Sequence, residues 1–372
     1  MKKQLMATTA LVAAGILVSG AVQAKPKLVL GGWFEGIVGV VDDDKTGPGG
    51  NHTTIDVHQD SEVHFNGAVT LDNGIKILTR LELEGQSANS TDQIDEAYMD
   101  ISGSFGAVRI GSEDSVAHLM VSDHQGSWAV QAGQNLQLDT GDWIEAPTGH
   151  AASTSVRLSL GDADSEKVTY FTPRVGGFQA GFSYLPSFSE GDNGEPESVS
   201  ENPHNGYSVG ANYRGKFGGA SVGLAAGYTV MNPTSNGADA SDPKGWGVSG
   251  SVGFSGFKIA AGYTAEKSLT GETNGGPTAG DSAIDIGISY KFGKNNVSAA
   301  WLHSEDKSGS AAGAGGAAED ETDVVMLSYS RDLAAGVEYR LNLIYADYQG
   351  AAIGSADDNE GIALTTSVRL AF

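Results

Sequence analysis

One pattern recurs from Leu28 to the end of this 372-residue sequence. An alternating apolar and polar segment of about ten residues meets a short turn, a second segment follows, and a longer polar loop comes next. The clearest example joins residues 62–71 to residues 75–85 through Asp72-Asn73-Gly74, because Asn-Gly accepts the positive φ of primed hairpin turns. We count sixteen segments, seven short turns and eight longer loops, with both termini on the short-turn side.

This pattern predicts an all-β fold, a sixteen-stranded antiparallel transmembrane β-barrel. An even strand number with the long loops on one side is typical of such barrels. Closure matters because an open sheet edge in hydrocarbon would leave backbone groups without partners. Aromatic residues at both strand ends favour two interfacial girdles, with Phe178 and Phe217 near the turns and Tyr228 and Tyr348 near the loops.

The N-terminus is predicted to be a signal peptide, residues 1–24, followed by one barrel domain, residues 25–372. Residues 1–3 are basic at Lys2 and Lys3, residues 5–18 are largely apolar, and residues 22–24 resemble a small-residue cleavage site. That apolar run is too short for a membrane helix, and no later stretch approaches the length required. A barrel strand needs only about ten tilted residues to cross a bilayer.

The predicted mature chain is strongly acidic and lacks cysteine. Without Lys2 and Lys3, 20 of the 22 basic residues remain against 46 acidic ones, a formal charge of −26. This charge makes nucleic acid an unsuitable partner. Cations, or divalent ions that bridge to anionic outer-membrane lipid, suit it better. The absence of cysteine means that packing and backbone hydrogen bonds must hold the fold.

Residues 112–150 interrupt the strand pattern with no regular period. The segment has no lysine or arginine, and its acidic residues are Glu113, Asp114, Asp123, Asp139, Asp142 and Glu145. Alternation resumes at residues 155–160 and 167–173. A loop this long within a regular strand pattern is normally functional or disordered. We expect it to fold into the pore and to control what passes.

Several stretches resemble the Gram-negative general diffusion porins, especially those of alphaproteobacteria. Residues 31–44, GGWFEGIVGVVDDD, resemble the first strand of that family. Residues 97–115, AYMDISGSFGAVRIGSEDS, resemble the hairpin that leads into its third loop. Residues 166–186, EKVTYFTPRVGGFQAGFSYLP, resemble a later Tyr, Pro and Gly-Gly-Phe run. The ending SVRLAF, with terminal Phe372, looks like an outer-membrane insertion signal.

The resemblance covers essentially the whole mature chain. It implies a homotrimer of sixteen-stranded barrels in a Gram-negative outer membrane, each with its third loop folded inward to narrow the pore. Two positions depart from the family pattern: Ser112 stands where arginine is common, and Glu166-Lys167 replaces Asn-Ser. The missing arginine leads us to expect a stronger cation preference than that of a family member that carries it.

A diffusion channel needs a narrow place whose charge selects ions, and no catalytic group. The candidate residues of the constriction loop are Glu113, Asp114, Asp123, Asp139 and Asp142. The candidate pore-wall residues, on the inward phase of their strands, are Lys76, Arg80, Arg109, Glu82 and Glu84. Each loop acid could equally be a solvated carboxylate. Arg80 and Arg109 could instead pair with wall acids and stiffen the barrel.

We therefore expect an outer-membrane channel for passive diffusion of small hydrophilic solutes and ions, selective for cations and not an enzyme. The first alternative is a substrate-selective porin, for example for a sugar, with Trp128 and Trp143 offering rings for stacking. The second is a soluble secreted β-protein, such as a lectin-like sandwich. The third is an enzymatic barrel, although no nucleophile-elbow motif is present.

No cofactor is expected. The histidines match no recognised metal-ligand spacing; those considered are His52, His58, His64, His118 and His124. The acidic runs at residues 42–44 and 357–360 are candidates for loosely bound Ca²⁺. Neither has the spacing of an EF-hand loop, and solvated acidic runs are the commoner explanation.

Overall fold

The computed structural model describes residues 25–45, 53–85, 94–147, 150, 152–158, 160, 165–187, 204–232, 242–267, 280–306, 320–350 and 358–372. The predicted signal peptide, His52 and Asp357 lie outside these residues.

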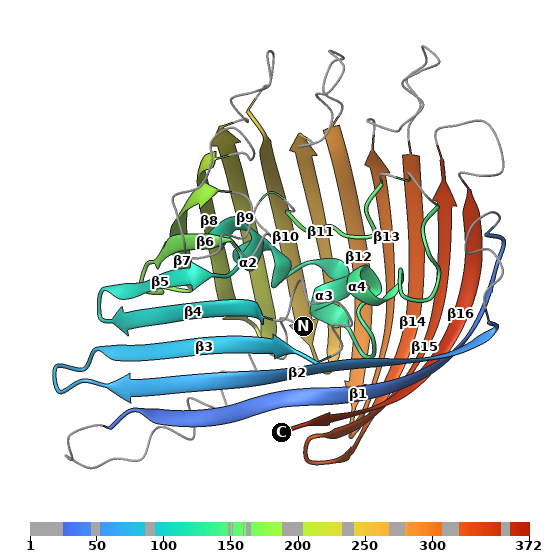
Figure 1. The fold of residues 1–372 in the computed structure, drawn as a ribbon, viewed down its shortest axis with the longest axis horizontal. Coiled ribbons are helices and arrows are strands. Elements are labelled where there is room, and N and C mark those ends of the chain that lie inside the picture. The colour runs from blue at the N-terminus through green and yellow to red at the C-terminus, as the bar shows by residue number, and fades with distance from the viewer. Residues whose placement is uncertain are drawn as a thin grey trace.

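Sixteen antiparallel strands form one closed barrel, which confirms the predicted fold class and strand number (Figure 1). The strands are β1 Lys27–Asp43, β2 Ile55–Thr70, β3 Lys76–Glu84, β4 Ile94–Gly103, β5 Gly106–Ser112, β6 Glu166–Phe171, β7 Phe178–Ser187, β8 His204–Phe217, β9 Ala220–Asn232, β10 Lys244–Phe254, β11 Phe257–Lys267, β12 Gly280–Phe292, β13 Asn295–Asp306, β14 Asp320–Ala334, β15 Val337–Gln349 and β16 Asn359–Ala371. Each strand pairs with its sequence neighbours, and β1 pairs with β16.

The last residue of the chain takes part in barrel closure. Gly32 and Phe372 exchange two backbone hydrogen bonds, each with an N···O distance of 3.0 Å. The closing ladder then runs from Trp33 opposite Ala371 to Asp43 opposite Gly361. No sheet edge is left between β1 and β16, as a bilayer requires.

Two parts of the strand pattern differ from the sequence expectation. Strand β2 begins at Ile55 rather than at residue 62, because polar residues alternate with the lipid-facing side chains there. Residues 155–158 alternate but form no strand. Instead, the backbone carbonyl of Val156 accepts a hydrogen bond from Gln125, and that of Leu158 contacts the His118 ring.

The outward face carries the expected aromatic residues at the turn ends, where Phe178 and Phe217 are exposed. Tyr348 was predicted to join the opposite girdle, and this is wrong. It lies on the inward phase of β15, has no exposed surface, and its hydroxyl donates to the carbonyl of Ile144 at 2.9 Å. One residue of register decides the face of a strand on which a side chain lies.

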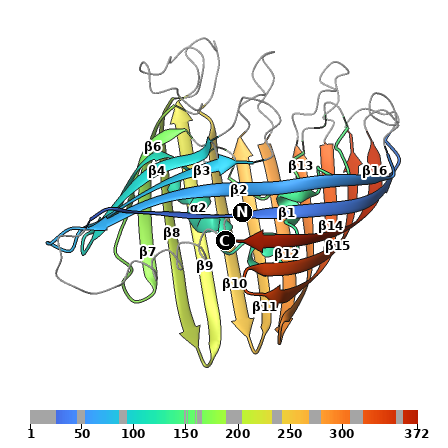
Figure 2. The same cartoon turned by 60° about the horizontal axis from the view of Figure 1, so that its bottom comes forward.

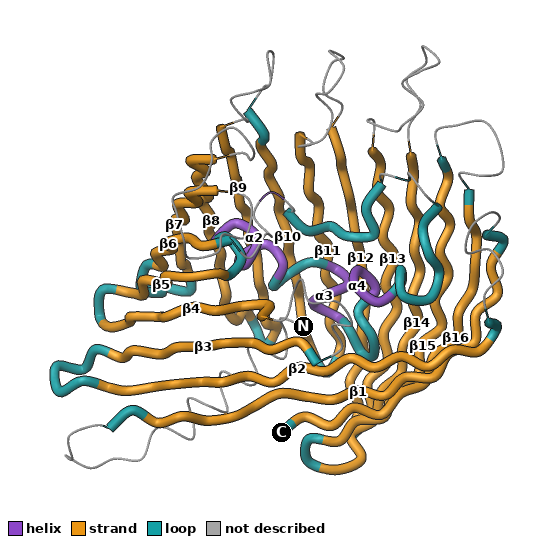
Figure 3. The backbone as a smooth tube through the Cα atoms, viewed as in Figure 1, coloured by secondary structure: helices purple, strands orange, loops and turns teal. Residues whose placement is uncertain are grey.

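Three short helices lie within the barrel, between β5 and β6 in sequence (Figure 3). They are α2 Val116–Ser122, α3 Gly126–Val130 and α4 Leu136–Asp139. We call residues 113–160 loop three. In Figure 2, β1 and β2 cross in front of the strands on which α2 and α3 pack. In the described part of the chain, no helix is long and apolar enough to cross a membrane.

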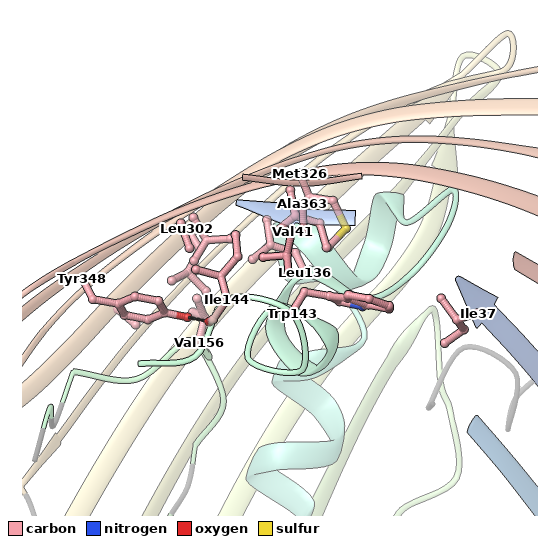
Figure 4. Close-up of a cluster of buried hydrophobic side chains, with 14 residues drawn as sticks. Ile37, Val41, Leu136, Trp143, Ile144, Val156, Leu302, Met326, Tyr348 and Ala363 are labelled. Carbon is pink, nitrogen blue, oxygen red and sulfur yellow. Dashed lines mark hydrogen bonds between the residues drawn. The ribbon is translucent and has the colours of Figure 1, made fainter. Parts of the chain in front are cut away.

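An apolar cluster fills part of the barrel interior (Figure 4). Loop three contributes Leu136, Trp143 and Ile144, and the strands around it contribute Leu302 and Met326 among others. These side chains are almost fully buried. Loop three therefore packs against the inner faces of β1 and β13–β16 through apolar side chains.

Candidate pore constriction

Helix α2 is attached to the barrel wall at its first turn. The backbone N–H of Val116 donates to Ser183 Oγ at 2.9 Å, and that of Ala117 donates to Ser208 Oγ at 3.1 Å. The preceding Ser115 makes no side-chain cap. Hydroxyl groups of β7 and β8 therefore satisfy N–H groups that the helix itself leaves without partners.

Glycines on the inner wall give loop three the space to approach. A Cβ at Gly227 of β9 would lie 2.7 Å from Ala117 Cβ, and a Cβ at Gly287 of β12 would lie 2.5 Å from Val130 Cγ2. Neither distance is compatible with van der Waals packing. The small residues of these strands thus fix how closely the helices dock.

Residues 141–147, which follow α4 in loop three, contact β16 and β2. Asn359 Nδ2 donates to the carbonyl of Glu145 at 2.8 Å. The Trp143 ring stacks on His58 of β2, with ring centroids 4.2 Å apart and an interplanar angle of 21°. Loop three therefore follows the inner wall from β7 round to β2.

The acids at the start of loop three are tied to the wall. Glu113 has no exposed surface, and its Oε2 lies 2.6 Å from Nη1 of Arg109. Arg109 also pairs with Asp100 at 2.7 Å and lies over the Tyr98 ring at 3.8 Å. Asp114 is buried, with a carboxylate oxygen 3.8 Å from His118 Nε2.

Lys167 places a cation beside the position that lacks the family arginine. It pairs in register with Gly111, next to Ser112, and its ammonium donates to the backbone carbonyls of Glu113 and Ser165. The premise that this region has lost a positive charge therefore does not hold in the structure. The stronger cation preference expected from Ser112 loses that support.

Asp123, at the end of α2, forms an ion pair with Arg214 of β8. Its charge is thus balanced at the wall. Of the five predicted loop acids, Glu113 and Asp123 are paired with arginine. Asp139 and Asp142 lie near each other, away from these two ion pairs.

Asp139 and Asp142 lie near Asp60 of β2, on the side of the barrel where Trp143 of loop three stacks on His58. Burial, opposed by a hydrogen bond from the Asn135 N–H and reinforced by the nearby carboxylates of Asp60, Glu35 and Asp142, raises the pKa of Asp139 to about 7. Burial also raises the pKa of Asp142, with His58 opposing and Asp60 adding to the effect. We call Asp60, Asp139 and Asp142 the passage carboxylates; none of them forms an ion pair with lysine or arginine among the described residues.

Asp142 also lines a cavity of about 220 Å³ at the long-loop end of β1 and β2. The acids around it are Asp43, Asp56, Asp142 and Glu145, and its one basic residue is Lys45. Lys45 forms an ion pair with Glu145. Negative charge therefore continues from the passage carboxylates to the mouth of the barrel.

The predicted wall arginine Arg80 lies within a group of acids. It forms an ion pair with Glu82, and its Nη2 lies 3.0 Å from His64 Nδ1. His64 Nε2 lies 2.5 Å from Glu62 Oε2. Carboxylate oxygens gather closely here, and the acids involved are Glu62, Glu82, Glu84, Asp95 and Glu96. We call these five residues the wall cluster.

The wall cluster and His64 offer ligand types that could hold a metal, and Arg80 contacts two of these residues, Glu82 and His64. Because Arg80 approaches His64 Nδ1, the proton of the ring belongs on Nε2, facing Glu62. Lys76, the other predicted wall cation, is exposed at the turn end of β3. The structure does not bring it next to loop three.

The tryptophans of loop three are packing residues. Trp128 is 3% exposed and Trp143 is 5% exposed. A sugar needs an accessible ring face for stacking, and neither side chain offers one. His118 and His124 are likewise engaged with the carbonyl of Leu158 and the hydroxyl of Ser251.

A closed barrel with a narrowed, charged interior defines a transmembrane channel. The chain belongs to the Gram-negative porin family, whose sequence profile matches residues 7–351. It is therefore an outer-membrane protein that forms a channel for passive diffusion, and its family and fold are those of a channel rather than an enzyme.

Solved porin structures share the fold at low sequence identity. The anion-selective porin of Comamonas acidovorans is 17% identical with a TM-score of 0.64, covering 94% of this chain and all (100%) of that one. OmpF of Salmonella typhi is 15% identical with a TM-score of 0.61, covering 93% and 98%. OmpT of Vibrio cholerae, solved in a trimer form, is 13% identical with a TM-score of 0.60, covering 93% and 99%. No curated protein sequence shows significant similarity to the chain.

Sequence reasoning missed Asp60 as a passage residue. Its inward phase is readable, because it alternates with Glu62 and His64 along β2. Its position beside loop three cannot be read from the sequence, because no local pattern specifies where a long loop docks.

Proposed function

We propose that this porin prefers cations, and that the passage carboxylates are the main cause. The observation that carries the proposal is the grouping of Asp60 of β2 with Asp139 and Asp142 of loop three. Grouped carboxylates beside a narrow aqueous path lower the energy of a cation there and raise that of an anion.

The neighbouring charged residues also favour a preference for cations. Arg340 and Arg369 are the basic residues near the passage, and both lie within 4 Å of Glu35 oxygens, at 2.8 and 3.6 Å. Arg340 also pairs with Glu338 at 2.7 Å. Two carboxylates, Glu35 and Glu338, thus offset the two arginines, which share Glu35. The Comamonas porin is anion-selective, so the shared fold by itself decides neither sign.

The test is the reversal potential of the mature channel in a planar bilayer under a KCl gradient. The triple variant Asp60→Asn, Asp139→Asn and Asp142→Asn should lower the K⁺/Cl⁻ permeability ratio several-fold. A matched control removes three acids from the outward face: Asp323→Asn, Asp347→Asn and Glu360→Gln. Equal permeability ratios in wild type and triple variant would contradict the proposal.

We further propose a homotrimer and cleavage of residues 1–24. The trimer is supported by family membership and by the trimer form of Vibrio cholerae OmpT. Mass determination of the detergent-solubilised native protein tests the assembly. The intact mass of one chain tests the cleavage site.

A further inference from the structure

Helix α3 is held by one carboxylate from a distant strand. Asp285 of β12 has no exposed surface, and its Oδ1 accepts the backbone N–H of Gly126 at 2.8 Å. Its Oδ2 accepts both the backbone N–H and the hydroxyl of Ser127, each at 2.7 Å. Gln125, which precedes the helix, makes no side-chain cap. Asp285 therefore satisfies the N–H groups that open α3.

The same hydrogen-bond network reaches α4 and residues 155–156 of loop three through Gln137. Gln137 Nε2 donates to Ser127 Oγ at 2.5 Å and lies 3.3 Å from Asp285 Oδ2. Gln137 Oε1 accepts the backbone N–H of Val156 at 3.0 Å and the hydroxyl of Ser155 at 2.8 Å. Three separate segments of loop three are thus joined to β12 through Asp285.

The chemistry of the site makes the carboxylate essential to this network. A carboxylate removed from water is costly unless donors satisfy it. In the described part of the chain Asp285 forms no ion pair with a basic side chain, and four N–H or O–H donors approach it instead. Hydrogen bonds to a charged acceptor are stronger than neutral ones, and a fully satisfied buried network is rigid.

The network determines where one of the passage carboxylates lies. Helix α4 contains Gln137 and ends at Asp139. A shift of α3 and α4 away from β12 would move Asp139 relative to Asp60 of β2. The width and shape of the passage therefore depend on contacts made behind the loop, out of reach of any passing solute.

We propose that Asp285 is a positioning residue for the constriction: its buried carboxylate fixes α3 and α4 against β12 and so sets the width of the passage. The proposal concerns the shape of the pore and does not depend on its ion preference.

Asp285→Asn tests the proposal with an isosteric change. One acceptor oxygen becomes an NH₂ group that faces N–H donors, so the loop should lose its fixed position while the barrel remains closed. Single-channel recordings should show a several-fold rise in open-channel current noise. Liposome swelling should admit neutral oligosaccharides that the wild-type channel excludes, a readout that mere barrel stability does not move.

Asp281→Asn is the matched control, because Asp281 lies on the same inward face of β12 and makes no hydrogen bond to loop three among the described residues. It should leave noise and size limit unchanged. Ser127→Ala removes the two hydrogen bonds of the Ser127 hydroxyl, to Asp285 and from Gln137, without a charge change, and should raise the noise to a smaller extent. It also decides the matter if Asp285→Asn fails to fold. Wild-type noise and size limit in the folded Asp285→Asn variant, or in Ser127→Ala if the former does not fold, would overturn the proposal. An equal effect in Asp281→Asn would overturn it as well.

Discussion

Arg109 of β5 binds Glu113, the first acid of loop three, with an N···O distance of 2.6 Å. The two residues lie four positions apart, where the chain leaves the strand and enters the lumen. Because Arg109 also holds Asp100 and covers Tyr98, the pair fastens the start of the loop to the wall. This relationship separates acids that hold the loop from acids that face the passage.

Glu113→Gln should leave the cation preference almost unchanged, because Arg109 already balances the charge of Glu113. Asp142→Asn, which removes an acid with no such partner, should lower the cation preference. Reversal potentials measured on the two single variants decide this. A larger shift for Glu113→Gln than for Asp142→Asn would show that the start of loop three lies in the passage.

Arg109→Met should destabilise the barrel, because it leaves Asp100 and Glu113 without their cation in a largely buried site. Removing one partner of a buried ion pair lowers the free energy of unfolding by about 3–5 kcal/mol. Urea unfolding in detergent measures this loss of stability, with the folded fraction monitored by its heat-modifiable migration in gel electrophoresis. Arg331→Met, at an exposed position, is the control, and an equal effect there would argue against a specific role for Arg109.

Gly227→Val should impair folding or displace α2, because even a Cβ at this position would lie 2.7 Å from Ala117 Cβ. We expect a lower yield of folded barrel, and an altered conductance in the fraction that folds. Gly36→Ala on β1 has its nearest neighbour at 3.9 Å and should behave as wild type. Normal yield and conductance in Gly227→Val would mean that the wall tolerates the side chain.

Cation preference should fall as the pH is lowered through 7. The pKa of Asp139 is raised to about 7, so its carboxyl is charged above that pH and neutral below it. Protonation removes one negative charge from the passage. Reversal potentials between about pH 8 and pH 6 should show the decrease, and Asp139→Asn should abolish this step, because an ordinary aspartate titrates near pH 4. A decrease that persists in Asp139→Asn would assign the step to another group.

The barrel could be predicted from the sequence because its signals are local. Alternation with a period of two and turn residues such as Asn73-Gly74 identify each strand without knowledge of its partners. The same locality caused the errors. Residues 155–158 alternate but bind loop three, and Tyr348 was placed on the wrong face because a strand pattern does not state its absolute phase.

The candidate site was harder to predict because it depends on docking. The acidic character of loop three is visible in the sequence, but the partners of Glu113 and Asp123 are not. Arg109 and Arg214 reach them from strands β5 and β8. Asp60 and Asp285 acquire their positions near the loop only when it packs against the glycine-rich wall, an arrangement set by tertiary contacts rather than by spacing.

The most direct test of the account is the reversal potential of the wild-type mature channel under a KCl gradient at neutral pH. The passage carboxylates predict a potential with the sign of selective K⁺ permeation, reduced by high salt as charges are screened. A potential near zero, or one with the sign of Cl⁻ permeation, would contradict the proposed cation preference.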